Sequence, residues 1–288
     1  MKISCLIASY RAGEYIGKAL ESIRAQEHAD WEVVVVEDGS RDETENIVRR
    51  FASSVSQPVR YENLGTNQGV SAARNRLLTL AQGEASAFID ADDWWTPRHL
   101  TNAANAFAQG ADLVVSGIEL FDLAANKPIK SYQPIAALYV DPIDTLFAGS
   151  AIMTSSCVAL RMSLVRNVGE FDRAFRIGED RDFWLRCAAA GAKFAGTNEV
   201  TCYYAKHASS TMAKTLLWAQ QEVAFYEKHF GFERVSLAAR KRNLAHVLSN
   251  YGRLLRATDR PASRKALKKS FALSPKFSTL LQLARSMA

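Results

Sequence analysis

The chain has 288 residues, of which 48% are hydrophobic and 23% charged, so it can bury a full core and is ordinary in composition for a globular protein. No apolar run approaches the roughly 20 residues that cross a bilayer, and Arg11 interrupts the apolar start too early for a secretory signal. The four cysteines are scattered without a C-x-x-C pair, which predicts buried thiols in a reducing compartment and therefore a cytoplasmic protein.

The net charge of +6 is distributed unevenly along the chain. Residues 234–288 contain 13 Lys and Arg but one acid, Asp259, whereas the rest of the chain has more acids than bases. We therefore expect two domains, an α/β domain over residues 1–211 and a basic helical extension over residues 212–288.

The first hundred residues alternate between strand and helix patterns. Apolar runs predict strands at residues 3–9, 31–36, 58–62 and 85–90. Helical spacing between these runs gives the order βαβαβαβ, which predicts a mostly parallel sheet with helices on both faces. Ser40 and Glu43 have the spacing of a capping box for the second helix.

Acidic residues follow two of these strands. Glu37 and Asp38 follow the second strand, and Asp90, Asp92 and Asp93 follow the fourth. The carboxyl ends of strands in a doubly wound sheet share one crevice, so these acids should lie along one edge. If the fourth strand continues through Asp90, then Asp90 and Asp92 point to the same side.

Carboxylates in this pattern suit a divalent metal that also binds substrate phosphates, so the cluster predicts a metal–diphosphate site. The alternatives are a plain turn after Asp38 and an acidic cap for the helix that follows Pro97. Asp93 fits the cap. Arg74, on the third helix, is expected to be a surface charge, to offset the acids, or to contact a nucleotide.

A second acidic cluster opens a predicted helix in the second half of the chain. Strand patterns at residues 112–123, 154–161 and 200–205 surround it. Glu179 and Asp180 stand in the first helical turn, where the helix dipole favours acids without any further role. A carboxylate placed within reach of a substrate hydroxyl would instead serve as a general base.

Four blocks of sequence together resemble the family 2 glycosyltransferases, which have the GT-A fold. The blocks are residues 3–10 (ISCLIASY), 33–44 (VVVVEDGSRDET), 67–75 (NQGVSAARN) and 88–97 (FIDADDWWTP). Their order and spacing are far more specific than a lone D-x-D. The resemblance implies a Rossmann-like, mostly parallel sheet in which residues 1–100 bind a nucleotide-sugar and residues 101–211 face the acceptor.

The resemblance also implies roles for single residues on the donor side. Asp38 would contact the base, Asp90 would lie near the ribose or sugar, and Asp92 would bind the metal. The donor-binding set implied in this way is Ala8, Tyr10, Glu37, Asp38, Asn67, Gly69, Arg74, Asp90 and Ala91. The chain departs from the family where Ala8 and Tyr10 replace a Pro-x-Tyr-Asn type of turn, and where Glu37 replaces the commoner Asp.

On the acceptor side, Glu179 and Asp180 match the family's Glu-Asp pair, which is followed here by an aromatic-Leu-Arg run. The resemblance makes Asp180 the catalytic base and Glu179 an acceptor-orienting residue or alternative base. A Tyr-x-x-His…Ser-x-Thr run that ends in Ser209 and Thr211 suggests that His207 completes the metal site or touches the diphosphate; a structural histidine is the alternative.

The function implied is a metal-dependent, inverting transferase that uses Mn²⁺ or Mg²⁺. It would move a sugar from a nucleoside-diphosphate sugar, most often a UDP-sugar, to a glycan or lipid-linked acceptor in bacterial-type surface polysaccharide or glycolipid assembly. A sugar nucleotidyltransferase and a non-catalytic nucleotide-sugar-binding protein are the alternatives. The first needs a Gly-rich basic loop that residues 9–14 match poorly, and the second has no need of Glu179 and Asp180.

The basic extension has three possible explanations. It is a solvated helical surface, a peripheral contact with anionic lipids at the inner face of the cell membrane, or a nucleic-acid contact. Each near-surface Lys or Arg contributes about 1 kcal/mol to binding anionic lipid. No aromatic-basic motif of nucleic-acid readers appears, so we expect no nucleic-acid partner.

Overall fold

The computed structural model describes residues 1–207 and 215–287. The chain divides into two compact units, with the boundary after residue 208. The predicted boundary after residue 211 lies outside the described residues and stays a prediction, as do the roles expected of Ser209 and Thr211.

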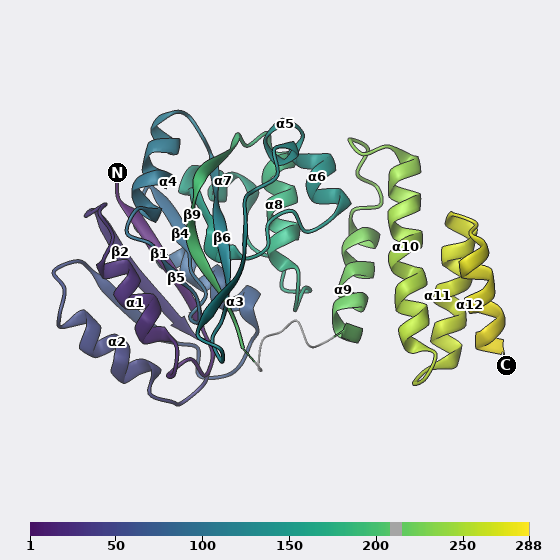
Figure 1. Cartoon of the computed structure of the whole chain (residues 1–288), viewed down its shortest axis with the longest axis horizontal. Helices are drawn as coiled ribbons and strands as arrows, with labels where there is room; N and C mark the ends of the chain where they lie inside the picture. Colours follow the sequence, from purple (N-terminus) through teal and green to yellow (C-terminus); the bar gives the residue numbers. More distant parts are fainter. Residues whose placement is uncertain (208–214, 288) are drawn as a thin grey trace. The chain divides into compact units, whose positions relative to one another are not determined.

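The N-terminal unit is built on a sheet flanked by helices, as Figure 1 shows. Its strands are β1 (Ile3–Ser9), β2 (Trp31–Glu37), β3 (Val59–Asn63), β4 (Ala85–Phe88), β5 (Trp94–Trp95), β6 (Leu113–Asp122), β7 (Lys127–Tyr132), β8 (Val158–Arg161) and β9 (Phe194–Lys206). The spatial order is β3-β2-β1-β4-β8-β6-β9-β5, and β7 pairs with β6 at the side.

The first four strands of this order are parallel. β2 is buried at every position, which suits its run of four branched valines between two neighbouring strands. The sequence prediction of a Rossmann-like α/β fold is therefore confirmed. In the second half the pairing is mixed, because β8 runs antiparallel to both β4 and β6, whereas β6 and β9 are parallel.

Helices connect these strands and cover the sheet. They are α1 (Ile16–Arg24), α2 (Thr44–Ala52), α3 (Val70–Leu80), α4 (His99–Ala108), α5 (Ala137–Val140), α6 (Pro142–Ala148), α7 (Met162–Val168) and α8 (Glu179–Ala189). α3 packs on β1 and β2, and α4 packs on β6 and β9. The predicted strand at 154–161 begins instead with a 3₁₀ turn (Ser155–Cys157), because the Thr154 side chain accepts a hydrogen bond from the Ser156 N–H.

The C-terminal unit consists of helices that lie side by side in Figure 1. They are α9 (Thr215–Lys228), α10 (Leu237–Leu255), α11 (Arg260–Leu273) and α12 (Phe277–Met287). The α10–α11 pair is close: the Ser263 hydroxyl donates to the Gly252 carbonyl at 2.7 Å, and a Cβ on Gly252 would lie 2.8 Å from Leu267. Among the described residues, no helix is long and apolar enough to cross a bilayer.

Candidate active site

The turn after β2 is joined to the loop before α3 by Asp38. Its carboxylate accepts hydrogen bonds from the backbone N–H groups of Gln68 at 2.7 Å and Gly69 at 2.8 Å. Asp38 is 4% exposed, so these bonds satisfy a nearly buried charge. Two segments that the sequence assigns to donor binding, residues 37–38 and 67–69, therefore meet at the carboxyl ends of neighbouring strands.

Gly39 makes this contact possible. Its φ is +83°, and a Cβ there would lie between 2.3 and 2.7 Å from backbone atoms of Thr66 and Asn67. Asn67 itself is exposed. A side chain at position 39 would push the loop away from the carboxylate that holds it.

Glu37 is a structural residue in this arrangement. It is 1% exposed and accepts hydrogen bonds from the hydroxyls of Ser9 at 2.7 Å and Ser40 at 2.6 Å. The capping box expected of Ser40 is therefore wrong, since that hydroxyl bonds to Glu37. Helix α2 begins at Thr44 and its cap, Glu43, has no side-chain hydrogen bond to the helix.

The remaining donor-side candidates are spread around this edge. Ala8 lies in β1 opposite Val36 of β2, and Tyr10 is 46% exposed just beyond the strand. Ala91 is buried in the acidic turn after β4. Within the described residues, Asp38 has no hydrogen bond to the acids of that turn.

The acids after β4 form a turn and not an extension of the strand. β4 ends at Phe88, and the Asp93 N–H donates to the Asp90 carbonyl at 3.0 Å. The strand alternation expected to align Asp90 with Asp92 does not apply, and the two carboxylates have different partners. Asp90 bonds to Arg74 and Asp92 bonds to His207.

Arg74 joins the acidic turn after β4 to α8. Its guanidinium donates to Asp90 Oδ1 at 3.0 Å and to Glu179 Oε1, and its side chain is 6% exposed. Burial alone would lower the pKa of Arg74, but the charges of Asp90, Glu179 and Asp180 raise it above the usual value. The arginine is therefore a buried cation that offsets three acids, one of the roles predicted for it.

Glu179 and Asp180 stand at the start of α8. Burial raises the pKa of Glu179 to about 7, while the charge of Arg74 limits that rise. Burial also raises the pKa of Asp180, again against the effect of Arg74. Asp180 is half-buried, its Oδ1 accepts from the Arg181 N–H at 2.7 Å, and it follows the nearly buried Glu179. These are two adjacent carboxyls in different environments, with Asp180 the more accessible.

Asp92 and His207 form a second polar pair. Asp92 Oδ2 lies 2.7 Å from His207 Nε2, and the imidazole stacks on Tyr15 with ring centroids 4.9 Å apart. Burial and the charge of Asp90 raise the pKa of Asp92, and His207 opposes this rise. The pair therefore brings together two residues that the sequence assigns to metal binding.

One carboxylate and one imidazole are a suitable protein share for Mn²⁺ or Mg²⁺, which also take ligands from substrate phosphates. In the part of the chain that the structure describes, no group of three or more His, Cys, Asp or Glu side chains is arranged to hold a metal ion. The pair fits a metal that needs the nucleotide to complete its coordination.

Asp93 does not cap a helix, and that expectation is wrong. α4 begins at His99, whereas Asp93 is fully buried and accepts hydrogen bonds from the Ser156 hydroxyl at 2.5 Å and the Ala205 N–H at 2.9 Å. Burial raises its pKa well above the usual value. Asp93 fixes the acidic turn to β9 and to the 3₁₀ turn before β8.

Sequence reasoning missed the hydroxyls that complete this network. Thr154 lies 3.4 Å from Asp90 Oδ2 and 3.3 Å from Asp93 Oδ2, and the Ser156 hydroxyl accepts from the Asp90 N–H at 2.9 Å. The only local signal was the polar T-S-S run that opens an otherwise apolar strand pattern. These hydroxyls link the acidic turn after β4 to the second half of the sheet.

Two solved structures share this architecture. S. aureus TarS in complex with UDP-GlcNAc is similar with a TM-score of 0.71, over 99% of this chain and 89% of that one, at 18% identity. A mannosyltransferase, PcManGT of Pyrobaculum calidifontis in complex with GDP-Man and Mn²⁺, gives a TM-score of 0.62 over 99% and 79% at 20% identity. The fold is the GT-A fold of glycosyltransferases.

The sequence assigns the family. The family model "Glycosyl transferase family 2" matches residues 4–169, and the chain belongs to that family. An uncharacterized glycosyltransferase of Nostoc sp. is 27% identical over 77% of this chain and 70% of its own length. WfaP of Escherichia coli, a UDP-Glc:alpha-D-GlcNAc-diphosphoundecaprenol beta-1,3-glucosyltransferase, is 24% identical over 73% of this chain and 80% of its own length. The predicted family is confirmed; the matched region contains Asp92 but ends before Glu179.

Proposed function

We propose that this chain transfers a sugar from a UDP-sugar to an acceptor hydroxyl with inversion at the anomeric carbon. The observation that carries the proposal is the buried cluster in which Arg74 pairs with Asp90 on one side and Glu179 on the other. It connects the donor-side turn directly to the Glu-Asp pair of α8. The UDP preference is supported by WfaP, named for UDP-Glc, and by TarS bound to UDP-GlcNAc.

In this reaction Asp180 accepts the proton of the acceptor hydroxyl. The hydroxyl oxygen forms a bond to the anomeric carbon while the bond from that carbon to the diphosphate oxygen breaks. The electron pair leaves with the nucleoside diphosphate. A single displacement of this kind inverts the anomeric carbon and forms no covalent enzyme intermediate.

The neighbouring residues position the two substrates. Glu179, held by Arg74, orients the acceptor hydroxyl, and Asp90 lies on the sugar side of the donor. The turn at Asp38, which holds the loop before α3, contacts the nucleobase of the donor. Asp92 and His207 would hold Mn²⁺ or Mg²⁺, which when bound neutralises negative charge on the departing diphosphate. PcManGT, which was solved with GDP-Man and Mn²⁺, supports a divalent metal.

The acceptor is a glycan or a lipid-linked glycan of surface polysaccharide or glycolipid assembly. WfaP is named for a diphosphoundecaprenol acceptor, which supports this class. The C-terminal unit contacts the inner face of the membrane. Its helix α12 exposes three large apolar side chains, Phe277, Leu280 and Leu281, which are 75%, 46% and 44% exposed. Their spacing places them on one side of the helix. Lys and Arg far outnumber acids in residues 234–288.

The catalytic proposal is tested with the variants Asp180→Asn and Asp92→Asn. Asp144→Asn is a matched control, because Asp144 is an exposed acid in the first turn of α6. With a panel of nucleotide-sugars and Mn²⁺, Asp180→Asn should bind donor normally but transfer sugar roughly 10²- to 10⁴-fold more slowly. Asp92→Asn should weaken metal-dependent donor binding. Transfer at the wild-type rate by both variants would overturn the mechanism.

Membrane contact is tested by sedimentation with vesicles that contain phosphatidylglycerol. Binding should weaken as salt rises, because screening reduces the attraction of basic residues for the surface. Replacing Phe277 and Leu280 by serine should reduce binding further. Equal sedimentation with neutral and anionic vesicles would contradict the proposal.

A further inference from the structure

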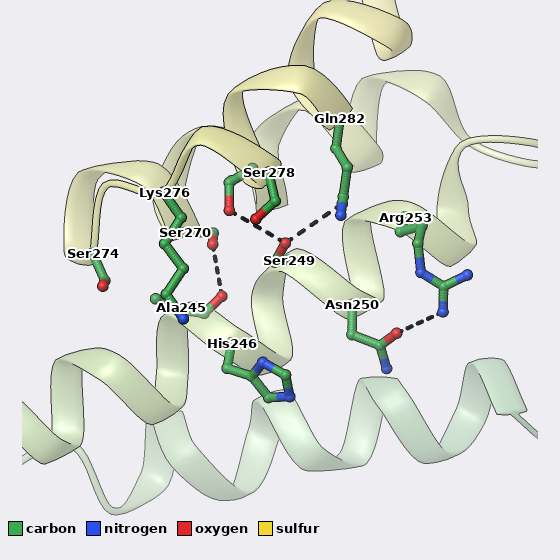
Figure 2. A pocket seen from close by; sticks show the side chains of 11 residues that line it. Ala245, His246, Ser249, Asn250, Arg253, Ser270, Ser274, Lys276, Ser278 and Gln282 are labelled. Carbon is green, nitrogen blue, oxygen red and sulfur yellow. Dashed lines mark hydrogen bonds between the residues drawn. The ribbon is translucent and has the colours of Figure 1, made fainter.

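The C-terminal unit contains a pocket of about 240 Å³ between α10, the end of α11 and the start of α12. Figure 2 shows polar side chains from these helices around it. Clefts that hold drug-sized ligands have volumes of roughly 300–1,000 Å³, so this one suits a single small group. All its lining residues lie within the same unit, and the pocket is therefore complete without the sheet.

Two cationic side chains, Arg253 and Lys276, and a histidine line the pocket. His246 and Arg253 are seven residues apart on α10 and therefore share a face, and Lys276 precedes α12. Arg253 donates to Asn250 Oδ1 at 2.8 Å, as Figure 2 shows, which holds its guanidinium on that face. Among the described residues that line the pocket none is acidic, and neither Arg253 nor Lys276 is ion-paired with a carboxylate there. This positive charge is uncompensated.

Hydroxyl and amide groups line the rest. The Ser249 hydroxyl lies 3.4 Å from both Thr279 Oγ1 and Gln282 Oε1, and Figure 2 shows Ser249 and Gln282 pointing toward each other. These distances exceed those of good O–H···O hydrogen bonds, so a ligand hydroxyl can replace the contacts at little cost. Thr279 is 2% exposed, so a polar group is available at the inner end of the pocket.

We propose that this pocket binds a phosphate-bearing saccharide group. Lys276, beside His246 at one end of the pocket, and Arg253, at the other end, offer the phosphate charge-assisted hydrogen bonds, which are the strong ones. Ser249, Thr279 and Gln282 exchange hydrogen bonds with the sugar hydroxyls. A neutral sugar would leave the basic side chains without an anionic partner, and a lipid tail would find few apolar groups among these residues.

Such a site would hold an acceptor that carries phosphate on or between its sugars. That role rests on the proposed function, because it assumes glycosyl transfer to a glycan. A second binding site on one chain raises the effective concentration of a tethered substrate without any new catalytic contact. The binding itself does not depend on catalysis and is measured separately.

The experiment uses the full chain with its donor site saturated by UDP and Mn²⁺. Glucose 1-phosphate, glucose and inorganic phosphate are titrated by calorimetry into the wild type. The pocket variant carries Arg253→Gln and Lys276→Gln. The control carries Lys265→Gln and Lys268→Gln, which remove the same charge from exposed α11 positions outside the pocket. Circular dichroism checks that both variants fold, which is expected because all four side chains are exposed.

We expect the wild type to bind glucose 1-phosphate at least about tenfold more tightly than glucose or phosphate alone. The affinity for glucose 1-phosphate should fall at least about tenfold in the pocket variant and change little in the control. Equal losses in the two variants would show non-specific attraction and overturn the site. Equal binding of inorganic phosphate would overturn recognition of the sugar. Loss of binding to phosphatidylglycerol vesicles in the pocket variant, with no binding of glucose 1-phosphate by the wild type, would assign the pocket to lipid headgroups and overturn the proposal. Sugar transfer to a small neutral acceptor should be unchanged in the pocket variant, so failure of the catalytic proposal is recognised independently.

Discussion

The guanidinium of Arg74 is ion-paired with Glu179, which lies 105 residues further along the chain, and both side chains are less than one-tenth exposed. The pair holds α3 against α8. It also places a cation beside carboxyls whose pKa values burial would otherwise raise further. Structure and chemistry therefore depend on the same contact.

Replacing Arg74 by glutamine should destabilise the protein by about 3–5 kcal/mol, because it leaves buried carboxyls without their cation. The pKa of Glu179 should rise above about 7 in this variant, since the attraction that limits it is lost. Urea unfolding measures the free energy. The matched control is Arg76→Gln on the same helix, which breaks a surface pair with Glu62 and should change stability little. Similar curves for the two variants would refute the role of Arg74.

The titration of the Glu179 carboxyl should contribute to the pH dependence of the free energy of unfolding. Its pKa is about 7 in the folded protein and 4.5 ordinarily, so between these values the folded state binds more protons than the unfolded state. Stability contributed by this group is therefore lost as pH rises through that window. Glu179→Gln should lose less stability than the wild type between about pH 4.5 and 7. Parallel urea-unfolding profiles would contradict this assignment.

Metal affinity should depend on His207 and, less strongly, on Tyr15. His207→Ala should weaken Mn²⁺ binding in the presence of UDP by more than roughly tenfold, because it removes one of the two proposed protein ligands. Tyr15→Leu removes the ring on which the imidazole stacks and should have a smaller effect. His28→Ala, which loses a hydrogen bond to the Met1 carbonyl, is the control. Calorimetry or Mn²⁺ spin resonance measures the affinity; unchanged binding in His207→Ala would exclude it as a ligand.

Alanine substitutions at Gly39 and Gly65 should distinguish the cost of steric crowding from the cost of backbone strain. Both have positive φ values, +83° and +77°, but a Cβ on Gly65 meets nothing within 4 Å. Gly65→Ala should therefore cost about 1 kcal/mol, the strain of the left-handed backbone alone. Gly39→Ala should cost a further ~1–3 kcal/mol and weaken UDP binding, because the added methyl displaces the loop that Asp38 holds. Equal costs by urea unfolding would show that the loop moves freely.

Sequence patterns predicted the elements whose signals are local. The valine run of β2 is buried and parallel to its neighbours, as its pattern predicts. Asp182 and Arg186 form an i,i+4 ion pair on α8, at 2.9 Å. In each case spacing along the chain determines the contact.

Patterns failed where the partner is distant in sequence. Ser40 has the spacing of a cap, yet Glu37 takes its hydroxyl; Asp93 precedes a helix, yet Ser156 and Ala205 bond to it. A buried carboxylate requires donors wherever the fold supplies them, and that requirement outweighs local propensity. Thr154 carried no assignment for the same reason, since its contacts with Asp90 and Asp93 exist only after β8 joins β4.

β5 is two residues long and pairs with β9, a strand that begins about a hundred positions later. The acidic turn is therefore tied, through Asp93 and Ala205 and through Asp92 and His207, to the far end of the same domain. A substitution near the end of β9 is therefore expected to move the acidic turn, although 112 positions separate Asp93 from Ala205 along the chain.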